Sequence, residues 1–406
     1  MNKNQTAVFS LPVIVAALGY FVDIYDLLLF NIVRIPSLRS LGLSQAGIDK
    51  QGEFIIGIQM VGLLIGGIIW GIAGDKKGRL SVLFGSIILY SLANIANGFV
   101  HTVPQYAVAR FIAGIGLAGE LGAGITLVSE LLRKEQRGIG TSLVAGIGLL
   151  GAVVAFFISQ KYDWRVCYFI GGGLGIILLF MRISIFESGM YQSLEKNISK
   201  GNFLMFFNNA HRFKKYLCSI LLGLPTWYVI GILIAFSNKF AKSFGMAEEI
   251  NPGKATMYAY VAISIGDVLA GLLSQLLKSR KKTLYIFYAI TAVMVAIYFM
   301  QTEKSTAANF YWITAGLGFA TGFWAIFVTM GAEQFGTNLR ATAATTVPNM
   351  VRGSLPLMLL LFNGLQSYFT YSLSGLLTGV IIMIITIIAA VNTEETFHKE
   401  LNYVES

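Results

Sequence analysis

Charged residues are scarce in this sequence of 406 residues: Asp, Glu, Lys and Arg make up 12% of it, and hydrophobic residues make up 55%. A soluble protein carries about twice that charged fraction. So few charges cannot cover a water-facing surface, which indicates that lipid covers much of this protein. At roughly 20 residues per membrane crossing plus short loops, twelve crossings fit and leave little over for a soluble domain.

Cysteine and histidine are also rare, with two and three residues. Cys167 and Cys218 each lie at the edge of an apolar run, and His101, His211 and His398 are far apart in the sequence. Neither set has the spacing of a metal site, so we expect no metal and no other cofactor. The sequence also has no Walker-type phosphate loop, which argues against an ATP-driven pump.

The formal net charge of +10 is compatible with nucleic-acid binding. However, the basic residues form short clusters between apolar runs, which is the distribution that the positive-inside rule gives for membrane proteins. We therefore expect membrane lipid around the protein and no nucleic-acid partner.

Twelve apolar runs predict twelve membrane-spanning helices, each long enough to cross about 30 Å of hydrocarbon. The runs lie at 9–33, 54–74, 80–100, 105–128, 139–159, 166–186, 216–238, 256–277, 283–301, 308–332, 344–366 and 370–391. The first run follows Lys3 as in a signal peptide, but no cleavage site of small residues follows and Asp23 and Asp26 interrupt it. We expect it to be retained as the first span.

Lys and Arg are concentrated in alternate connections, which sets the orientation. Three such clusters are 76–79, 133–137 and 278–282, and Arg182 is counted with the connection after the sixth run. The other connections hold fewer basic residues, among them Arg34. This pattern predicts that both termini are cytoplasmic.

The sequence divides into two halves that resemble each other. Glu130 is followed seven residues later by Arg137, and Glu333 is followed seven residues later by Arg340. Both pairs are predicted at the inner end of an even-numbered span, and a duplicated six-helix unit is a common transporter plan. We predict an N-terminal six-helix bundle at 1–186, a cytoplasmic linker at 187–215, and a C-terminal bundle with a short cytoplasmic tail at 216–406.

The most specific loop motif lies between the second and third spans, where Gly71-Ile-Ala-Gly-Asp75 leads to Gly78-Arg79. The glycines allow a tight turn and close helix approach, and Asp75 is suited to face a helix N-terminus or an Arg. This stretch resembles the signature loop of the major facilitator superfamily, from which Leu80 departs at the last position. The second half has a decayed copy, with Gln275 where the Asp would be.

A second group of motifs resembles the metabolite:proton symporters of that superfamily, which include proline/betaine, citrate and shikimate carriers. These motifs are Asp23-Ile-Tyr25-Asp26, the stretch from Arg110 to Glu120, Ser129-Glu130, Arg137-Gly138 and Phe186-Glu187-Ser188, with Gly189 where the family usually has Pro. The resemblance implies an all-α membrane protein with twelve transmembrane helices in two pseudo-symmetric six-helix bundles. It also implies a bacterial inner-membrane transporter, not an enzyme, which we expect to be a monomer. Gly71, Asp75, Gly78, Arg79, Glu130, Arg137, Glu333 and Arg340 are then expected to act in the conformational change.

Charged residues inside spans are costly, so they are candidates for function. Asp23 and Asp26 are three residues apart on one helical face. Asp26 and Arg110 lie at similar predicted depths, and we predict that they pair. This pair is either a static salt bridge or a proton-sensitive contact whose breakage lets the helices rock.

Glu120 lies deeper in the fourth span, either as a group that handles protons or substrate or as a satisfied carboxylate between helices. Arg352 on the eleventh span is a candidate for binding a substrate carboxylate, since Arg grips carboxylates with two hydrogen bonds. The alternative is a bridge between Arg352 and Asp267. Asn349 lies in the same polar stripe as Arg352, and Tyr260 in the same stripe as Asp267.

Aromatic residues complete the substrate-binding candidates. Tyr25 lies between the two acids of the first span, and Trp227, Tyr228 and Trp324 lie in the seventh and tenth spans. Lining a cavity is one role for the last three residues, and contact with lipid or packing between helices is the other.

Two stretches match the dinucleotide-binding pattern G-x-G-x-x-G, at 114–119 and 146–151. That pattern needs a preceding strand within a βαβ unit, and neither stretch has one. We interpret these glycines as small residues that let membrane helices approach closely.

The expected function is proton-coupled import of a small polar metabolite, such as an amino acid, osmolyte or organic acid. The first alternative is a proton-coupled antiporter that exports a drug or metabolite; its family usually carries Gly-Pro in the fifth span, which the stretch 146–151 lacks. Sugar uptake is less favoured because 221–237 has no Gln. A non-transporting membrane sensor is the alternative of a different class.

Overall fold

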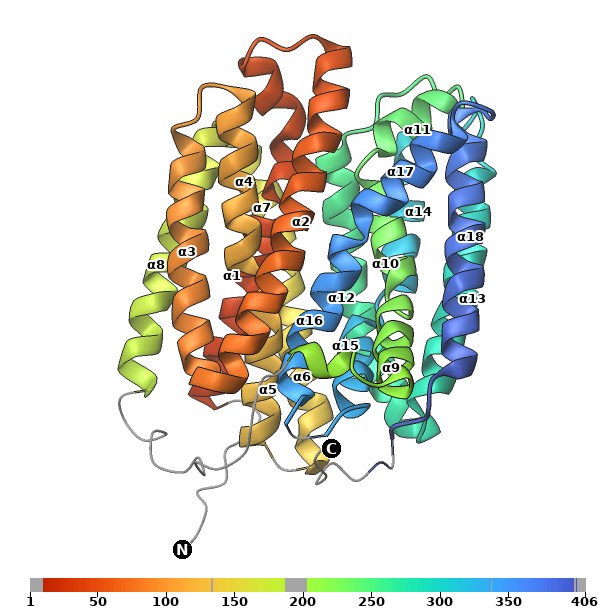
Figure 1. The fold of residues 1–406 in the computed structure, drawn as a ribbon. Helices are drawn as coiled ribbons and strands as arrows, with labels where there is room; N and C mark the ends of the chain where they lie inside the picture. The colour runs from red at the N-terminus through yellow and green to blue at the C-terminus, as the bar shows by residue number, and fades with distance from the viewer. Residues whose placement is uncertain (1–9, 133, 187–202, 337, 398, 400–406) are drawn as a thin grey trace, which may run out of the picture.

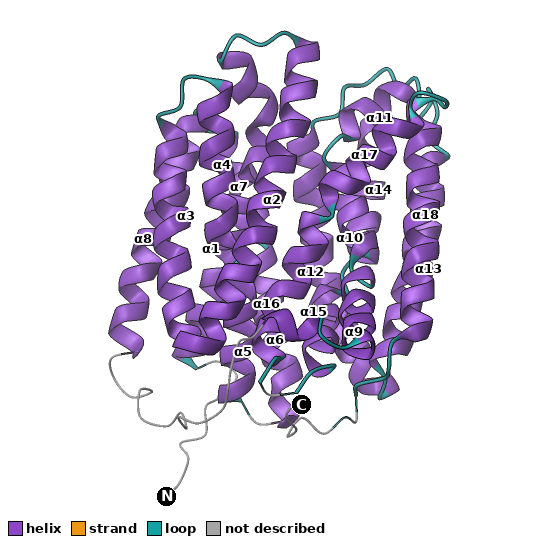
Figure 2. Cartoon of the chain, in the orientation of Figure 1, coloured by secondary structure: helices purple, strands orange, loops and turns teal. Residues whose placement is uncertain are grey.

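The computed structural model describes residues 10–132, 134–186, 203–336, 338–397 and 399. Within these ranges the chain is helical and has no strand (Figure 2). Backbone N–H and C=O groups in lipid must be paired, and a helix pairs them within one segment. The all-helical architecture predicted from the apolar runs is confirmed.

Eight helices make up the described residues of the first half. They are α1 (Leu11–Ser40), α2 (Gln45–Lys77), α3 (Arg79–Gly98), α4 (Val103–Leu117), α5 (Glu120–Leu131), α6 (Lys134–Leu149), α7 (Gly151–Ser159) and α8 (Trp164–Phe186). The fourth crossing is built from α4 and α5, and the fifth from α6 and α7.

The second half is more broken. Its elements are η1 (Phe203–Phe206), α9 (Ala210–Leu221), α10 (Leu224–Tyr228), η2 (Val229–Ile234), α11 (Ser237–Ser243), α12 (Pro252–Leu277), α13 (Arg280–Phe299), α14 (Ala307–Ala320), α15 (Trp324–Glu333), α16 (Arg340–Gly353), α17 (Leu355–Leu365) and α18 (Tyr371–Asn392). The predicted linker, 187–215, lies partly outside the described residues, and α9 begins inside it.

Ten segments of the described chain are long and apolar enough to cross a membrane. The two remaining crossings are interrupted helices. The apolar stretch Leu143–Ser159 is shorter than the others, and the pair α16–α17 carries the polar side chains of Thr345, Asn349 and Arg352. With these two, the described residues contain the twelve transmembrane helices that the sequence predicts.

The two halves form two bundles that stand side by side, α1–α8 in one and α9–α18 in the other (Figure 1). The breaks within crossings recur at matching places. The fourth and tenth crossings break between α4 and α5 and between α14 and α15, and the fifth and eleventh break at Leu150 and Ser354. Paired discontinuous helices mark the midplane substrate site in transporters with internal repeats, so these breaks direct attention to the interface between the bundles.

The turns after the second and eighth crossings also match. Gly78 ends α2 with φ 90°, and Lys278 ends α12 with φ 47°. Only glycine adopts such a conformation freely. The glycine predicted to allow a tight turn in the signature loop is therefore required there by the backbone itself.

Glycines bring helix backbones together, as predicted for the two G-x-G-x-x-G stretches. A Cβ on Gly114 would collide with the carbonyl oxygen of Gln59 on α2, and one on Gly151 would collide with that of Phe21 on α1. These positions have no room for a side chain, so their interpretation as close-approach residues is confirmed.

The first two helices are longer than their apolar runs. The runs end at 33 and begin at 54, whereas α1 continues to Ser40 and α2 starts at Gln45. Hydropathy reports only the part of a helix that contacts apolar surroundings, so polar helical extensions escape it. The Ser44 side chain accepts a hydrogen bond from the Gly47 amide and caps α2 at its actual start.

Candidate functional site

A small cavity lies between the two bundles. It measures about 20 Å³, which holds about one water molecule. Its walls come from α1, α6, α10, η2, α12, α15 and α16, and they consist of Tyr20, Ile24, Leu27, Leu149, Thr226, Trp227, Ile230, Tyr260, Ile263, Trp324 and Arg352. Among the predicted substrate-binding residues, Trp227, Trp324 and Arg352 line it.

Arg352 is the charged residue of this cavity. Its side chain is 1% exposed. One Nη donates to the Asn349 side-chain oxygen at 3.2 Å, the guanidinium lies 5.7 Å from the centre of the Trp324 ring, and Nε has no hydrogen-bond partner. The alternative bridge between Arg352 and Asp267 is absent from the described structure. The guanidinium therefore keeps unused hydrogen-bonding capacity beside the cavity.

Asp23 lies on α1 in the other bundle, next to the cavity residues of that helix. It shares a face of α1 with the cavity residues Tyr20, Ile24 and Leu27, which lie three positions before it and one and four after it. Its side chain is fully buried, and neither carboxylate oxygen has a hydrogen-bond partner. The charged groups close enough to act on it are Arg352 and Arg182, which favour its ionised form, and Glu120 and Asp26, which oppose it. Burying an ionised carboxyl without a partner is costly, so a proton or a cation must balance the charge of Asp23.

The predicted pair of Asp26 and Arg110 forms in a different way. One Arg110 Nη donates to the backbone carbonyl of Asp26 at 3.3 Å, and the other donates to the Asn94 side-chain oxygen. The guanidinium also lies 4.7 Å from the centre of the Tyr168 ring. Neither Asp26 carboxylate oxygen accepts a hydrogen bond. The prediction of a carboxylate–guanidinium salt bridge was wrong, because depth along two helices does not fix which atoms of the residues face each other.

Glu120 is a satisfied carboxylate. Both of its oxygens accept hydrogen bonds from Arg182, each at 2.8 Å, and Ser86 donates at 3.2 Å. Both partners of the ion pair are almost fully buried. Arg182 was counted above with the connection after the sixth run, but it is a buried partner of Glu120 and not a loop residue. This geometry favours the structural role of Glu120, since a bidentate Arg leaves little capacity for substrate.

Asp267 stabilises the break in the tenth crossing. One carboxylate oxygen accepts from the Ala325 amide at 2.8 Å, at the first turn of α15. The first amides of a helix lack intrahelical partners and attract negative charge. Asp267 on α12 supplies this partner from a neighbouring helix. The first residue of α15, Trp324, lies in the cavity wall.

Three further residues predicted to bind substrate do not line the cavity. The Tyr25 hydroxyl donates to the Cys167 carbonyl at 2.9 Å, and the Tyr228 hydroxyl donates to the Gly375 carbonyl at 2.8 Å. Each ring therefore packs within its own bundle, and neither lines this cavity. Asn349 donates to the Ala118 carbonyl at 2.7 Å and orients Arg352.

Hydrogen bonds close the cavity toward the end of the bundle at which α11 and α17 lie, which we call the outer end (Figure 1). Lys239 on α11 lies 3.3 Å from Glu53 and 3.5 Å from Asp49, both on α2. Asn363 on α17 donates to Glu53 at 3.2 Å. Arg34, counted as a loop charge, is 2% exposed and donates to the Ala235 carbonyl at 2.9 Å. Each contact joins the two bundles.

The opposite, inner end is closed by direct packing of α16 on α2 and α5. A Cβ on Gly71 would lie 3.1 Å from a methyl carbon of Thr346, and Gly122 on α5 packs against Thr345. On the other side of the cavity, Ser264 on α12 donates to the Gly146 carbonyl at 2.7 Å. With both ends closed, the chain is in an occluded conformation.

An ion-pair cluster holds the inner ends of the C-terminal bundle together. Glu333 accepts two hydrogen bonds from Arg280, at 3.1 and 3.2 Å, and one from Thr396 at 2.7 Å. Arg340 donates to the Phe335 carbonyl at 3.3 Å. The side chains of four other conformational candidates lie outside the described residues: Asp75, Arg79, Glu130 and Arg137.

The C-terminal tail joins this cluster through Glu395. Its carboxylate accepts hydrogen bonds from the Ser279 hydroxyl and from the amides of Arg280 (2.9 Å) and Lys281 (3.1 Å), at the start of α13. Burial alone would raise the pKa of Glu395, but these hydrogen bonds outweigh it and hold that pKa below its usual range.

This pKa predicts an acid-sensitive attachment of the tail. A carboxyl whose pKa is lowered by folding stabilises the contact fully above its ordinary value of about 4.3 and loses the contact as pH falls through the lower folded value. We expect hydrogen-exchange protection of the Arg280 and Lys281 amides to drop in that acid range. Glu395→Gln should lower the protection of these two amides at all pH values. Glu394→Gln should not, because Glu394 contacts Lys215 and Lys399 instead; equal loss in both variants would contradict the assignment.

Tyr20 and Thr226 line the cavity, and Arg182 is the partner of Glu120, although the sequence patterns above did not indicate these roles. Tyr20 precedes Asp23 by three positions, so helical periodicity alone places it on the same face. Arg182 lies within the apolar run 166–186, where a basic residue is itself a signal of a buried partner. Thr226 carries no such signal, because the seventh crossing changes from α10 to the π-helix η2 beside it.

The profile of the Major Facilitator Superfamily matches residues 16–356. The chain belongs to the major facilitator superfamily. It is 25% identical over 361 residues to a niacin transporter of Acinetobacter baylyi, covering 81% of each protein. It is 25% identical over 338 residues to a benzoate transport protein of the same organism, covering 69% of this chain and 72% of that protein.

Its fold is also similar to that of a solved major facilitator structure, a proton:xylose symporter bound to 6-bromo-6-deoxy-D-glucose. The TM-score is 0.69 at 15% sequence identity, over 96% of this chain and 97% of that one. The superfamily predicted from the signature loop is confirmed. The protein is therefore a multi-pass membrane transporter of small organic substrates and not an enzyme.

Proposed function

We propose that this major facilitator protein is a proton-coupled symporter that imports a small organic carboxylic acid by alternating access. The observation that carries the proposal is the position of Asp23 and Arg352 on opposite bundles beside the occluded cavity. Each is fully buried, and each keeps polar atoms without a hydrogen-bond partner.

Charge balance explains how one proton and one carboxylate would be coupled. While Asp23 is ionised, it attracts Arg352 and competes with an anionic substrate. When Asp23 takes a proton, Arg352 is left as an uncompensated cation in a buried site, which favours binding of a carboxylate. Proton and substrate therefore load together. Release of the proton at the inner side restores the attraction and expels the substrate.

The cavity lining favours a flat, partly apolar substrate. Tyr20, Trp227, Tyr260 and Trp324 supply four aromatic side chains around Arg352, and aromatic rings stack on such walls. The Trp324 indole N–H and the Thr226 hydroxyl have no hydrogen-bond partner, so they remain available to polar substituents. Niacin and benzoate, which two relatives carry, are planar rings with a carboxylate.

Alternating access would use the two closures in turn. The outer contacts of Lys239 and Arg34 and the inner packing of α16 on α2 must break at different times. The signature loop with Gly71, Asp75, Gly78 and Arg79 lies at the inner end of α2, where we assign it to this change. Glu130, Arg137, Glu333 and Arg340 belong to the same conformational set.

The supporting residues of the N-terminal bundle have separate tasks in this proposal. Asp26 and Arg110 form a second polar centre near the proton site, and Glu120 with Arg182 keeps α5 against α8. We place the protein in a bacterial inner membrane as a monomer. The distribution of its basic residues supports the placement of both termini in the cytoplasm.

The proposal predicts substrate-driven proton entry. Proteoliposomes that contain the full chain and an internal pH dye should acidify when nicotinate or benzoate is added outside, and the rate should saturate with concentration. Protein-free liposomes are the essential control, because neutral weak acids also cross bilayers unaided, without saturation. Alkalinisation would indicate antiport. Binding without any flux would indicate a sensor.

A further inference from the structure

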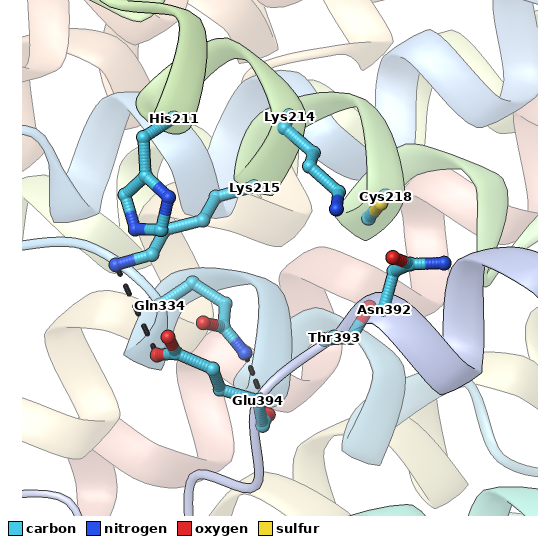
Figure 3. A pocket seen from close by; sticks show the side chains of 8 residues that line it. All are labelled: His211, Lys214, Lys215, Cys218, Gln334, Asn392, Thr393 and Glu394. Carbon is cyan, nitrogen blue, oxygen red and sulfur yellow. Dashed lines mark hydrogen bonds and ion pairs between the residues drawn. The ribbon is translucent and has the colours of Figure 1, made fainter.

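A second cavity lies at the inner end of the C-terminal bundle, between the start of α9 and the end of α18. It measures about 70 Å³ and lies apart from the central cavity. Figure 3 shows the eight side chains that line it: His211, Lys214, Lys215, Cys218, Gln334, Asn392, Thr393 and Glu394.

One face of α9 gives this cavity its positive charge. His211, Lys214 and Lys215 follow the helical spacing of three and four residues, so all three point to the same side. Lys215 lies 3.9 Å from Glu394, which Lys399 also approaches at 3.4 Å. The acidic group is therefore already balanced. Lys214 forms no hydrogen bond or ion pair with the described part of the chain, which leaves its charge available.

Exposed apolar side chains lie close in sequence to the residues that line this cavity. Leu217 follows Lys214 by three positions on α9 and is 40% exposed, and Val391, next to Asn392 on α18, is 64% exposed. Phe207 and Phe213, just before and within α9, are also exposed and contact each other. In a membrane protein such a surface faces acyl chains. At the inner end of a membrane helix, Lys side chains reach out of the apolar layer to headgroup level.

The cavity is built on an anchored segment. Phe206 of η1 is fully buried and stacks on Tyr216 with ring centres 4.3 Å apart. The Asn209 side chain accepts from the His211 amide at 2.8 Å and begins α9. The Thr386 hydroxyl of α18 donates to the Leu221 carbonyl of α9 at 3.0 Å. The basic face of α9 is thus held at a fixed position beside α18.

We propose that this cavity binds the headgroup of an anionic phospholipid. Its phosphate oxygens would lie between Lys214 and Lys215, and its acyl chains along Leu217 and Val391. Basic pockets between helices at the inner surface of membrane proteins bind such headgroups. The bordering apolar residues favour a lipid over a free phosphate ion, which would gain nothing from them. Since α9 leads directly to Thr226 and Trp227, the lipid would act on an element that carries the central site.

The test is lipid binding to the purified full-length protein. Native mass spectrometry in detergent would measure apparent dissociation constants for phosphatidylglycerol and for phosphatidylcholine. The wild-type protein should bind phosphatidylglycerol more tightly. The double variant Lys214→Gln/Lys215→Gln should bind it about 30-fold more weakly, since each basic residue near an anionic surface contributes about a factor of five. Phosphatidylcholine binding should not change.

A matched double variant, Lys278→Gln/Lys282→Gln, removes the same charge from the C-cap of α12 and the first turn of α13 and should bind phosphatidylglycerol like the wild type. Equal weakening in both double variants would overturn the proposal, because it would reduce the effect to general surface charge. Inorganic phosphate that competes as well as the lipid would also overturn it and assign a soluble anion site. Thermal unfolding midpoints in phosphatidylcholine should match in all three proteins, which excludes misfolding as the cause.

Discussion

Replacement of Asp23 by Asn should abolish accumulation of substrate against its gradient while sparing exchange of substrate across the membrane. Asn resembles the protonated carboxyl in shape and charge, so the loaded state still forms. It cannot release a proton, so the empty transporter has no return step linked to the pH gradient. For one proton per carboxylate, each pH unit supports about a tenfold accumulation, and the variant should fall to a ratio of about one.

Asp26→Asn is the matched control, because Asp26 lies one helical turn along α1 and is equally buried. Its surroundings are Arg110 and Asn94 within the N-terminal bundle rather than Arg352 across the interface. We expect slower transport with the accumulation ratio retained. The opposite result, with accumulation lost in Asp26→Asn and kept in Asp23→Asn, would move the proton to Asp26.

The dependence of substrate accumulation on membrane potential shows independently how many protons enter with each substrate. One proton with one monocarboxylate carries no net charge, so a potential alone should drive no accumulation. If Asp23 and Asp26 both carried protons, one net charge would enter per cycle. A potential of 100 mV would then support an accumulation of about 50-fold, at about 2.3 kcal/mol per charge.

The sequence was sufficient for the number and order of the membrane helices because lipid imposes a simple rule. A crossing needs about 20 apolar residues whatever its neighbours are. The twelfth run, 370–391, differs from α18 by one residue at each end. Where the rule does not apply, prediction failed: the polar extensions of α1 and α2 lie beyond the apolar runs, and helical propensity, not hydropathy, determines where they end.

The candidate site could be predicted only in part, because which atoms meet depends on helix rotation and on breaks. Their positions within apolar runs mark Asp23 and Arg352 as buried charges, but do not reveal that they lie beside the same cavity in opposite bundles. Trp227 and Tyr228 are neighbours in sequence, yet the first lines the cavity and the second bonds to Gly375. A rotation of about 100° per residue separates them, and no composition argument distinguishes their directions.

The sequence also does not reveal which groups pair with the buried charged side chains. The charge count assigned Arg182 and Arg34 to loops because they lie near the ends of apolar runs. In the structure, one neutralises Glu120 and the other reaches the Ala235 carbonyl across the bundle interface. Long Arg side chains bridge several ångströms, so a residue near the end of a span can serve a buried acid as easily as the membrane surface.

Replacement of Arg352 by Lys should weaken binding of carboxylate substrates strongly while the site stays positively charged. Lys supplies one ammonium group where Arg supplies a planar fork that matches both carboxylate oxygens. Loss of one hydrogen bond to a charged group amounts to about 1.5–3 kcal/mol, or roughly 10- to 150-fold in affinity. Isothermal titration of the purified protein with nicotinate or benzoate would measure this change.

Two controls separate recognition of the carboxylate from general damage. The amide of the same acid, nicotinamide or benzamide, has no charge to pair, so its weaker binding should change little in Arg352→Lys. Arg39→Lys replaces an exposed arginine in the last turn of α1 and should leave both ligands unaffected. Unchanged carboxylate affinity in Arg352→Lys would exclude Arg352 as the substrate's partner.

The pH dependence of binding then tests whether Arg352 and Asp23 act as one unit. In the wild type, carboxylate affinity should fall as pH rises, by up to tenfold per unit once Asp23 loses its proton in the substrate-free protein. In Asp23→Asn the affinity should stay high and independent of pH, since nothing competes for Arg352. Combining both substitutions closes a double-mutant cycle. At high pH, only the proteins that keep Asp23 carry the competing charge, so the cycle should show a coupling free energy between positions 23 and 352. At low pH, Asp23 is neutral like Asn, so this coupling free energy should vanish.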